Sequence, residues 1–169
     1  PLTYGREYDP HRSFFEQLKD LIHAAPQPAL WTDYPSLVNS DYVNYTATAK
    51  NCYLIFTADY CENVLYSSIL LRNKDMMDSL MMAESELCYF DIGCDSSYMT
   101  HFSEDCRGCR NVYFSKECVD CSNCFGCINL KSKNYYIFNQ PYTREEYEKK
   151  VAEFAIHTWD GLQKAREKA

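Results

Sequence analysis

The stretch Lys116–Leu130, KECVDCSNCFGCINL, places Cys118, Cys121, Cys124 and Cys127 three residues apart. Side chains repeat every two residues in a β-strand and every 3.6 in an α-helix, so this spacing belongs to neither. The other six cysteines fall on the same one-in-three phase: Cys52, Cys61, Cys88, Cys94, Cys106 and Cys109. Because ten cysteines share one phase, the sequence indicates a repeating fold whose period is a multiple of three.

Outward from this stretch, a twelve-residue repeat begins at Asn39 and recurs eight times, the last copy one residue short. Positions 2, 5, 8 and 11 hold every cysteine and otherwise mostly Ser, Thr, Val and Ala, whereas positions 3 and 4 are rich in Tyr and Phe. Asn or Asp fills six of the eight first positions, and Leu87 and Met99 fill the other two. The six are Asn39, Asn51, Asn63, Asp75, Asn111 and Asn123.

The repeat predicts an all-β solenoid of about eight coils. A chain that turns every three residues, with the middle residue of each side pointing inward, closes after four sides. At about 3.3 Å per residue, each side is roughly 10 Å long and successive coils stack about 4.8 Å apart, so the lumen admits only small side chains. Asn at the turns fits, because Asn tolerates the left-handed backbone.

A flatter solenoid with 24 residues per coil is the alternative, and it would bury Phe90, Phe102 and Phe114 on alternating strands. The pattern of Cys at positions 2 and 8 with Ser at position 5 resembles the tight β-helix of insect antifreeze proteins in architecture. The ice-binding Thr-x-Thr face of that family is not matched, because outward positions 1 and 3 hold Asn and aromatic residues. Only Cys88 with Cys94 repeats the paired cysteines within one coil.

The two ends of the chain predict one α-helix each. Asp9 followed by Pro10 predicts a helix start, and the apolar stripe that follows stops at Pro26. Thr143 with Glu146 predicts a capping box at the start of the second helix. The expected domains are an N-terminal helix and linker at 1–38, the solenoid at 39–142 and a C-terminal capping helix at 143–169. The apolar residues are Phe14, Phe15, Leu18, Leu21 and Ile22 in the first helix, and Tyr147, Val151 and Phe154 in the second.

The outward aromatic columns would be a large exposed apolar patch if nothing covered them. We therefore expect at least one terminal helix to lie along them, and any uncovered remainder to bind a protein partner or a second copy of the chain. The residues of this expected surface are Tyr53, Tyr89, Phe90, Phe102, Tyr113, Phe114 and Phe125.

Composition narrows the partners and the compartment. A net charge of -7 disfavours binding to nucleic acid, which usually requires clustered Lys and Arg. No run of about 18 apolar residues predicts a membrane span, and the opening residues lack the pattern of a secretory signal. The sequence thus predicts a cytoplasmic protein with reduced cysteines.

Two segments of the chain, Asn123–Lys150 and Tyr4–Lys19, resemble a family of uncharacterised cysteine-rich repeat proteins of uncultivated bacteria. In that family similar repeats often follow zinc-ribbon-like segments, which this chain lacks. The resemblance implies an intracellular origin and a chain that is part of a longer protein, and it brings no activity.

The densest cysteines are the candidate metal ligands: Cys94, Cys106, Cys109, Cys118, Cys121, Cys124 and Cys127. Two Cys-x-x-Cys pairs separated by eight residues match a zinc or iron-sulfur pattern, and copper(I) also prefers thiolates. The repeat alone produces the same spacing, so cysteine as a small buried core residue is the competing hypothesis, and disulfide bracing is the third.

The sequence predicts no enzyme and no catalytic residues. The histidines are scattered, and the one near the cysteines, His101, lies on an outward position. No phosphate-binding loop, zincin helix or nucleophile elbow is present. Asp91, on the inward phase, is expected to act as a buried hydrogen-bonding residue like the serines around it.

Overall fold

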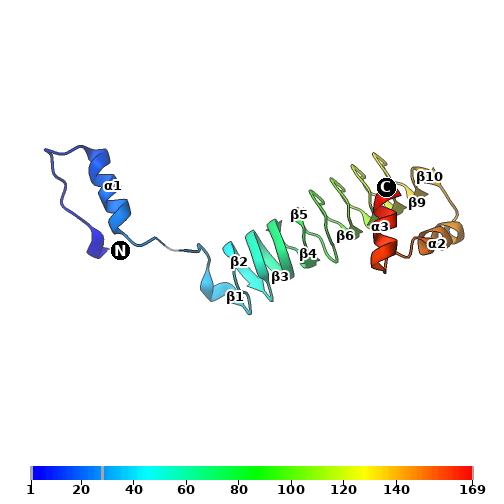
Figure 1. Cartoon of the computed structure of the whole chain (residues 1–169), viewed down its shortest axis with the longest axis horizontal. Helices are drawn as coiled ribbons and strands as arrows, with labels where there is room; N and C mark the ends of the chain where they lie inside the picture. The colour runs from blue at the N-terminus through cyan, green and yellow to red at the C-terminus, as the bar shows by residue number, and fades with distance from the viewer. Residues whose placement is uncertain (1, 28, 169) are drawn as a thin grey trace. The chain divides into compact units, whose positions relative to one another are not determined.

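The computed structural model describes residues 2–27 and 29–168. It divides into two compact units, Pro1–Trp31 and Thr32–Ala169 (Figure 1). The helical elements are η1 (Leu2–Tyr4), α1 (Phe14–Ala24), η2 (Tyr34–Ser36), α2 (Arg144–Glu153) and α3 (Trp159–Lys168). The strands are β1 (Leu37–Val38), β2 (Asn44–Lys50), β3 (Tyr53–Leu71), β4 (Lys74–Met77), β5 (Leu80–Ala83), β6 (Tyr98–His101), β7 (Arg110–Tyr113), β8 (Ser122–Phe125), β9 (Asn134–Ile137) and β10 (Gln140–Pro141).

The second unit is the predicted β-solenoid, with helices on either side of its strands in the sequence. Its strands β1 to β9 pair in parallel with a register of twelve residues, as in Asn44 with Phe56 and Arg110 with Ser122, and the short β10 pairs antiparallel with β9. Isolated bridges such as Lys116 with Ile128 keep the same register between the named strands. Each coil therefore holds twelve residues, and the 24-residue alternative is wrong.

The period of three comes from the backbone. Every third residue from Asn39 to Phe138 has a positive φ, between 46° and 66°. A left-handed backbone costs about 1–2 kcal/mol for a residue with a side chain. Each turn compensates by hydrogen bonding, because its N–H group donates to the preceding coil, as Asn51 N does to the carbonyl of Val38 at 2.9 Å.

The first column stabilises these turns with side-chain amides. Asn39 Nδ2 donates to Asn51 Oδ1 at 2.9 Å, and Asn51 Nδ2 donates to Asn63 Oδ1 at 3.0 Å. The ladder stops where Leu87 and Met99 replace Asn, and it resumes further along the chain. The predicted role of Asn at the turns is confirmed by both its backbone conformation and these bonds.

The lumen is filled by the middle residue of each side. Ile55, Val64 and Met82 are fully buried in the first half of the solenoid, where hydrocarbon side chains predominate. Inward serines accept hydrogen bonds from the next coil, as Ser67 Oγ does from the N–H group of Ser79 at 3.0 Å. Polar residues are therefore tolerated inside, because their partners come from the neighbouring coil.

The helix of the first unit differs from its predicted start. α1 begins at Phe14 with Ser13 as its N-cap, so the helix start predicted at Asp9 is wrong. Asp9 instead forms a turn, in which its Oδ1 accepts from the N–H group of His11 at 2.9 Å. All eleven residues of α1 are described, and none is buried.

The C-terminal segment forms two helices where the apolar pattern predicted one. The capping box of Thr143 and Glu146 opens α2 as expected. The chain then bends at Ala155, whose φ is 47°, and Thr158 Oγ1 accepts from the N–H group of Gly161 at 3.1 Å near the start of α3. A Cβ on Gly161 would collide with the carbonyl oxygen of Ala155, so this tight bend requires glycine.

Candidate functional site

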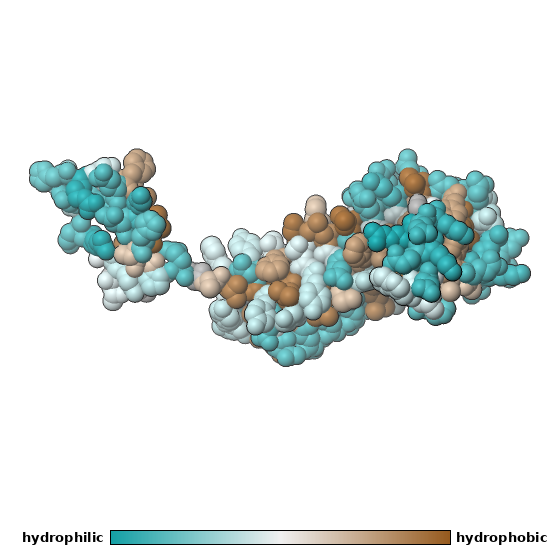
Figure 2. Space-filling view, viewed as in Figure 1, coloured by the Kyte–Doolittle hydropathy of each residue, from teal (hydrophilic) through white to brown (hydrophobic). Residues whose placement is uncertain are grey.

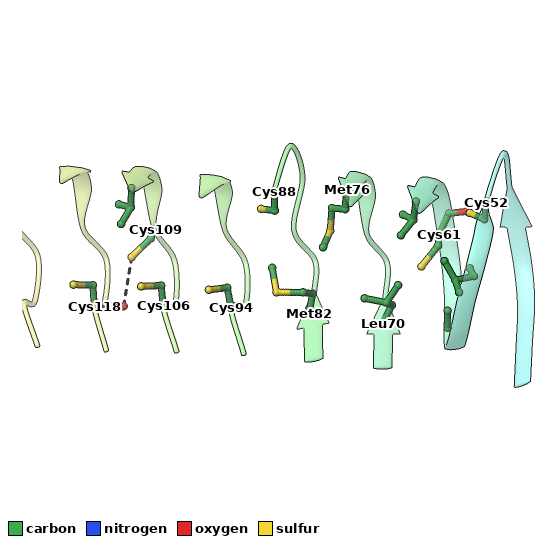
Figure 3. Close-up of a cluster of buried hydrophobic side chains, with 14 of the residues drawn as sticks. Cys52, Cys61, Leu70, Met76, Met82, Cys88, Cys94, Cys106, Cys109 and Cys118 are labelled. Carbon is green, nitrogen blue, oxygen red and sulfur yellow. Dashed lines mark hydrogen bonds between the residues drawn. The ribbon is translucent and has the colours of Figure 1, made fainter. Parts of the chain in front are cut away.

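The solenoid brings all seven candidate metal ligands into one lumen, each of them buried. Cys94, Cys106 and Cys118 form one column on successive coils, as Figure 3 shows. Cys109 and Cys121 form the neighbouring column, and Cys124 and Cys127 lie on adjacent sides of the last coil. The structure thus confirms that the shared one-in-three spacing places these thiols together in the lumen.

Each thiol has its own backbone partners. The Sγ atom of Cys109 donates to the carbonyl of Arg107 at 3.5 Å and to that of Cys118 at 3.4 Å. Ser97, one coil earlier in the same column, makes the equivalent bonds to Asp95 at 3.0 Å and Cys106 at 3.4 Å. Cysteine therefore occupies the place of serine, as a small inward side chain with one weak donor.

Burial controls the ionisation of the isolated thiols, and neighbouring sulfurs control it in the dense part. Burial raises the pKa of Cys61 to about 11 and that of Cys88 to about 12. The pKa of Cys106 is raised chiefly by the neighbouring thiol of Cys109, and further by those of Cys118 and Cys94. The pKa of Cys118 is lowered to about 6, because the Cys106 thiol stabilises its thiolate.

The thiols do not converge on a metal. All ten cysteines are free, and residues 2–27 and 29–168 contain no group of three or more Cys, His, Asp or Glu side chains arranged to hold an ion. A tetrahedral zinc site needs four ligands at about 2.0–2.3 Å from one point, whereas these columns point the sulfurs at separate carbonyls. The geometry favours cysteine as a core residue over zinc, copper(I) or iron-sulfur ligation.

Asp91 is a fully buried acid in the same lumen. Its Oδ2 accepts from the hydroxyl of Thr100 at 2.9 Å, and its Oδ1 accepts from the N–H group of Ser103 at 2.8 Å. Burial raises the pKa of Asp91 to about 7 despite these bonds. Asn73 shows the neutral equivalent, because its Oδ1 accepts from the N–H group of Ser85 at 2.9 Å and its Nδ2 donates to the carbonyl of Met82 at 2.7 Å.

The outward residues at positions 3 and 4 of successive coils form one edge of the solenoid, which we call the aromatic corner. Rings touch along it, as in Tyr42 with Tyr53, whose centroids lie 5.5 Å apart, and Phe102 with Phe114, stacked at 4.9 Å. Its members are Tyr42, Tyr53, Tyr66, Tyr89, Phe90, His101, Phe102, Tyr113, Phe114, Phe125 and Phe138.

The C-terminal segment covers one end of the aromatic corner. Phe154 stacks on the buried ring of Phe125 with centroids 4.4 Å apart, and Tyr147 of α2 is buried beside Tyr135. Gly126 takes a corner position where a Cβ would collide with the ring of Phe138. The expected packing of a terminal helix against the aromatic columns is confirmed here.

The other end of the aromatic corner is uncovered within its unit. Tyr42, Tyr66 and Phe90 are 65%, 51% and 49% exposed. Figure 2 shows hydrophobic side chains gathered on the solenoid between β2 and α3. This part of the aromatic corner is left uncovered by α2 and α3.

Asn139 is a structural residue that the sequence pattern did not reveal. Its Oδ1 accepts from the N–H group of Ile128 at 2.9 Å, and its Nδ2 donates to the carbonyl of Ile128 at 3.0 Å. The side chain thereby replaces one rung of the missing next coil and closes part of the open edge. It lies beyond the eight repeats that the sequence reveals, so no repeat position identified it.

Comparison with known proteins adds little to this geometry. No protein-family model and no curated protein sequence matches the chain. Among solved structures, it is similar to the acetyltransferase domain of PglB from Neisseria gonorrhoeae FA1090, with 5% identity over 64% of this chain and a TM-score of 0.15. The match spans 55% of that chain, and at this level it carries no functional argument.

The length and hydropathy of the helices decide whether any of them could span a membrane. Within the described residues, none of them is long and apolar enough to cross a bilayer.

Proposed function

We propose that this protein is a non-enzymatic β-solenoid rod that assembles with a second copy of itself through the uncovered part of the aromatic corner. The observation that carries the proposal is the contrast along this corner, where Phe125 is buried by the C-terminal segment and Tyr66 is half exposed. The covered end is a precedent within the chain, since apolar side chains already pack on the same columns there.

Charge favours a second copy as the partner. Position 12 of the first four coils alternates in sign, with Lys50, Glu62, Lys74 and Glu86, and within the chain Lys50 Nζ already lies 2.7 Å from Glu62 Oε1. This column and the aromatic corner border the same side of the coil. A two-fold axis between Glu62 and Lys74 would run two rods antiparallel, so that Lys50 faces Glu86 of the second copy and Glu62 faces its Lys74. Such a column is complementary to itself, as a symmetric dimer requires.

Sedimentation velocity over a range of concentrations tests the proposal. The wild-type chain is expected to dimerise, and Tyr66→Asp, near the axis, is expected to weaken the dimer by about 100-fold, since buried aromatic residues dominate interface energies. Lys74→Glu sets Glu62 against a second carboxylate and is expected to weaken the dimer about tenfold. Adding Glu62→Lys to Lys74→Glu restores the opposite charges and is expected to recover dimerisation.

Lys131→Glu, at an exposed position on another edge of the solenoid, is the matched control and should leave the dimer intact. A chain that stays monomeric up to high micromolar concentration would overturn the proposal. A dimer that is indifferent to Tyr66→Asp and to the charge exchange would place the interface elsewhere and would overturn it equally.

A further inference from the structure

The regular pairing of the solenoid is interrupted at its fifth coil, residues 87–98. No strand lies within residues 84–97, all of which the structure describes, and this is the longest such stretch between Tyr53 and Ile137 (Figure 1). Strands β1 to β5 form one sheet and β6 to β10 form another. Backbone bonds still cross the fifth coil, as from Ile92 N to the carbonyl of Ser103 at 3.0 Å, but the coil pairs with its neighbours through isolated bridges.

The side-chain ladder of the first column breaks at the same coil. Its last bond before the break runs from Asn63 Nδ2 to Asp75 Oδ1 at 2.7 Å, and the ladder resumes at Asn111. Leu87 and Met99 hold the turns in between, with φ values of 55° and 54°, and their side chains cannot form such bonds. The fifth coil therefore carries the cost of a left-handed turn without the amide bonds that stabilise the Asn turns of this column.

Asp91 lies in the lumen of this coil, where a negative charge has no cation beside it. Its carboxylate oxygens accept from Thr100 and Ser103, as described above. The other inward residues of the fourth, fifth and sixth coils are Met, Ser, Thr and Cys, so the titratable groups that face Asp91 are thiols. Ionisation of Asp91 thus places a buried charge among dipoles without a counter-ion, which is costly. The thiols are Cys88 and Cys94 on its own coil and Cys106 and Cys109 on the next.

We propose that the fifth coil is a pH-sensitive joint of the rod, which opens when Asp91 loses its proton while the coils on either side stay folded. Opening lets water reach the carboxylate and exposes the lumen. Cys88 is the first thiol to become accessible, because it lines the shallow groove that Asp75, Leu87 and Met99 border over the interrupted ladder. The inference does not depend on dimerisation, since every group in it belongs to one chain.

The difference in the pKa of Asp91 between the closed and open coil sets the size of the effect. Burial raises this pKa to about 7 in the closed coil, and water restores the ordinary value of 3.8 in the open coil. The stability of the closed coil is therefore fully present below about pH 4 and is lost as the pH rises through about 7. Between pH 5 and pH 7 the ratio of open to closed coil is expected to rise about 50-fold, and to change little above that.

Hydrogen exchange of the whole chain, followed by mass spectrometry at pH 5, 6, 7 and 8, tests the joint. Asp91→Ser is the matched control, because Ser79 and Ser103 hold the same column one coil before and one coil after. Dividing the wild-type rate by the variant rate at each pH removes the pH dependence of amide exchange itself. This ratio is expected to rise about 50-fold from pH 5 to pH 7 in residues 84–97, and by less than about twofold in β3.

Alkylation by N-ethylmaleimide, located by peptide mass, is a second measurement of the same opening. Cys88 and Cys61 are both 2% exposed, but only Cys88 lies on the coil of Asp91. Relative to Asp91→Ser, the wild-type rate at Cys88 is expected to rise with pH in parallel with hydrogen exchange. The corresponding ratio at Cys61 is expected to stay level.

Thermal unfolding shows whether Asp91→Ser folds, and Asp91→Asn is the second control if it does not. Exchange in residues 84–97 that follows the same pH dependence in the wild type and in a folded control would overturn the proposal. Equal acceleration in β3 and in residues 84–97 would mean that the chain opens as a whole, and would overturn it as well.

Discussion

The two halves of the solenoid share one backbone and differ in what fills and covers it. In the first half, Ile55, Val64 and Met82 fill the lumen and the aromatic corner is bare. In the second half, cysteines such as Cys106 fill the lumen and the C-terminal segment buries Phe125. The turn at every third residue thus determines which side chains point inward. Side chains of different chemistry, aliphatic in one half and thiol in the other, can then fill the same inward positions.

Truncation of a ring in the aromatic corner should cause the largest loss in the free energy of unfolding, and only at the end that the C-terminal segment covers. Phe125→Ala removes a fully buried ring and is expected to lower the free energy of unfolding by about 4–5 kcal/mol. Phe90→Ala, in the same aromatic corner but half exposed, is expected to cost about 1 kcal/mol. Urea unfolding followed by circular dichroism measures both. Equal losses would mean that the C-terminal segment does not anchor on Phe125.

The buried acid should make the second half sensitive to pH. The pKa of Asp91 is raised from its ordinary value of 3.8 to about 7, so the folded state holds a proton that the unfolded state releases. This stability is fully present below about pH 4 and is lost as the pH rises through about 7, amounting to at most about 4 kcal/mol.

Asp91→Asn is the matched variant, because Asn73, in another inward column, shows that a buried amide finds partners in the next coil. The variant is expected to lack this pH dependence and to unfold at higher urea concentration than the wild type at pH 8. Parallel urea titrations at pH 4 and pH 8 measure the difference. If the wild type and the variant respond to pH identically, Asp91 ionises normally.

Serine in place of a core thiol should have a small effect. Cys109→Ser keeps both carbonyl partners, as Ser97 does one coil earlier in the same column. The expected cost is about 1 kcal/mol, with no change in melting temperature on adding a chelator. A loss above about 3 kcal/mol, or melting that responds to the chelator, would instead indicate a thiolate-bound metal.

The smallest expected effect tests the strained turns. Ile69 is β-branched and half exposed, and it holds a φ of 58°. Ile69→Asn is expected to raise the free energy of unfolding by about 0.5–1 kcal/mol, because Asn tolerates this backbone better. Asn63→Ile, the reverse change at another turn, should destabilise the chain by at least as much. Thermal denaturation of both variants decides whether backbone preference dominates at these positions.

The sequence predicts the solenoid well because each turn is local. The phase of the cysteines identifies the inward positions, and the Asn column identifies turns with positive φ, so the lumen and the aromatic corner follow directly. The capping box at Thr143 is equally local, since its bonds join residues three apart.

What the sequence could not supply depends on contacts between distant residues. The Cys-x-x-Cys pairs suggested a metal site, whereas in the folded lumen each of these four thiols reaches a carbonyl nine residues ahead in the next coil. The break at Ala155 follows the placement of Phe154 on Phe125, which an apolar periodicity does not reveal. Asn139 closes an edge that exists only once the coils have stacked.

The register of twelve residues also limits how the chain can change in length. Insertion of one residue would shift every later residue out of phase, so that charged corner residues such as Glu117 would face the lumen and cysteines would face water. Three extra residues would preserve inward and outward but rotate the aromatic corner to another edge, away from the C-terminal segment. Only gain or loss of a complete coil leaves all four edges aligned, so the gene can lengthen this rod without redesign only in blocks of 36 nucleotides.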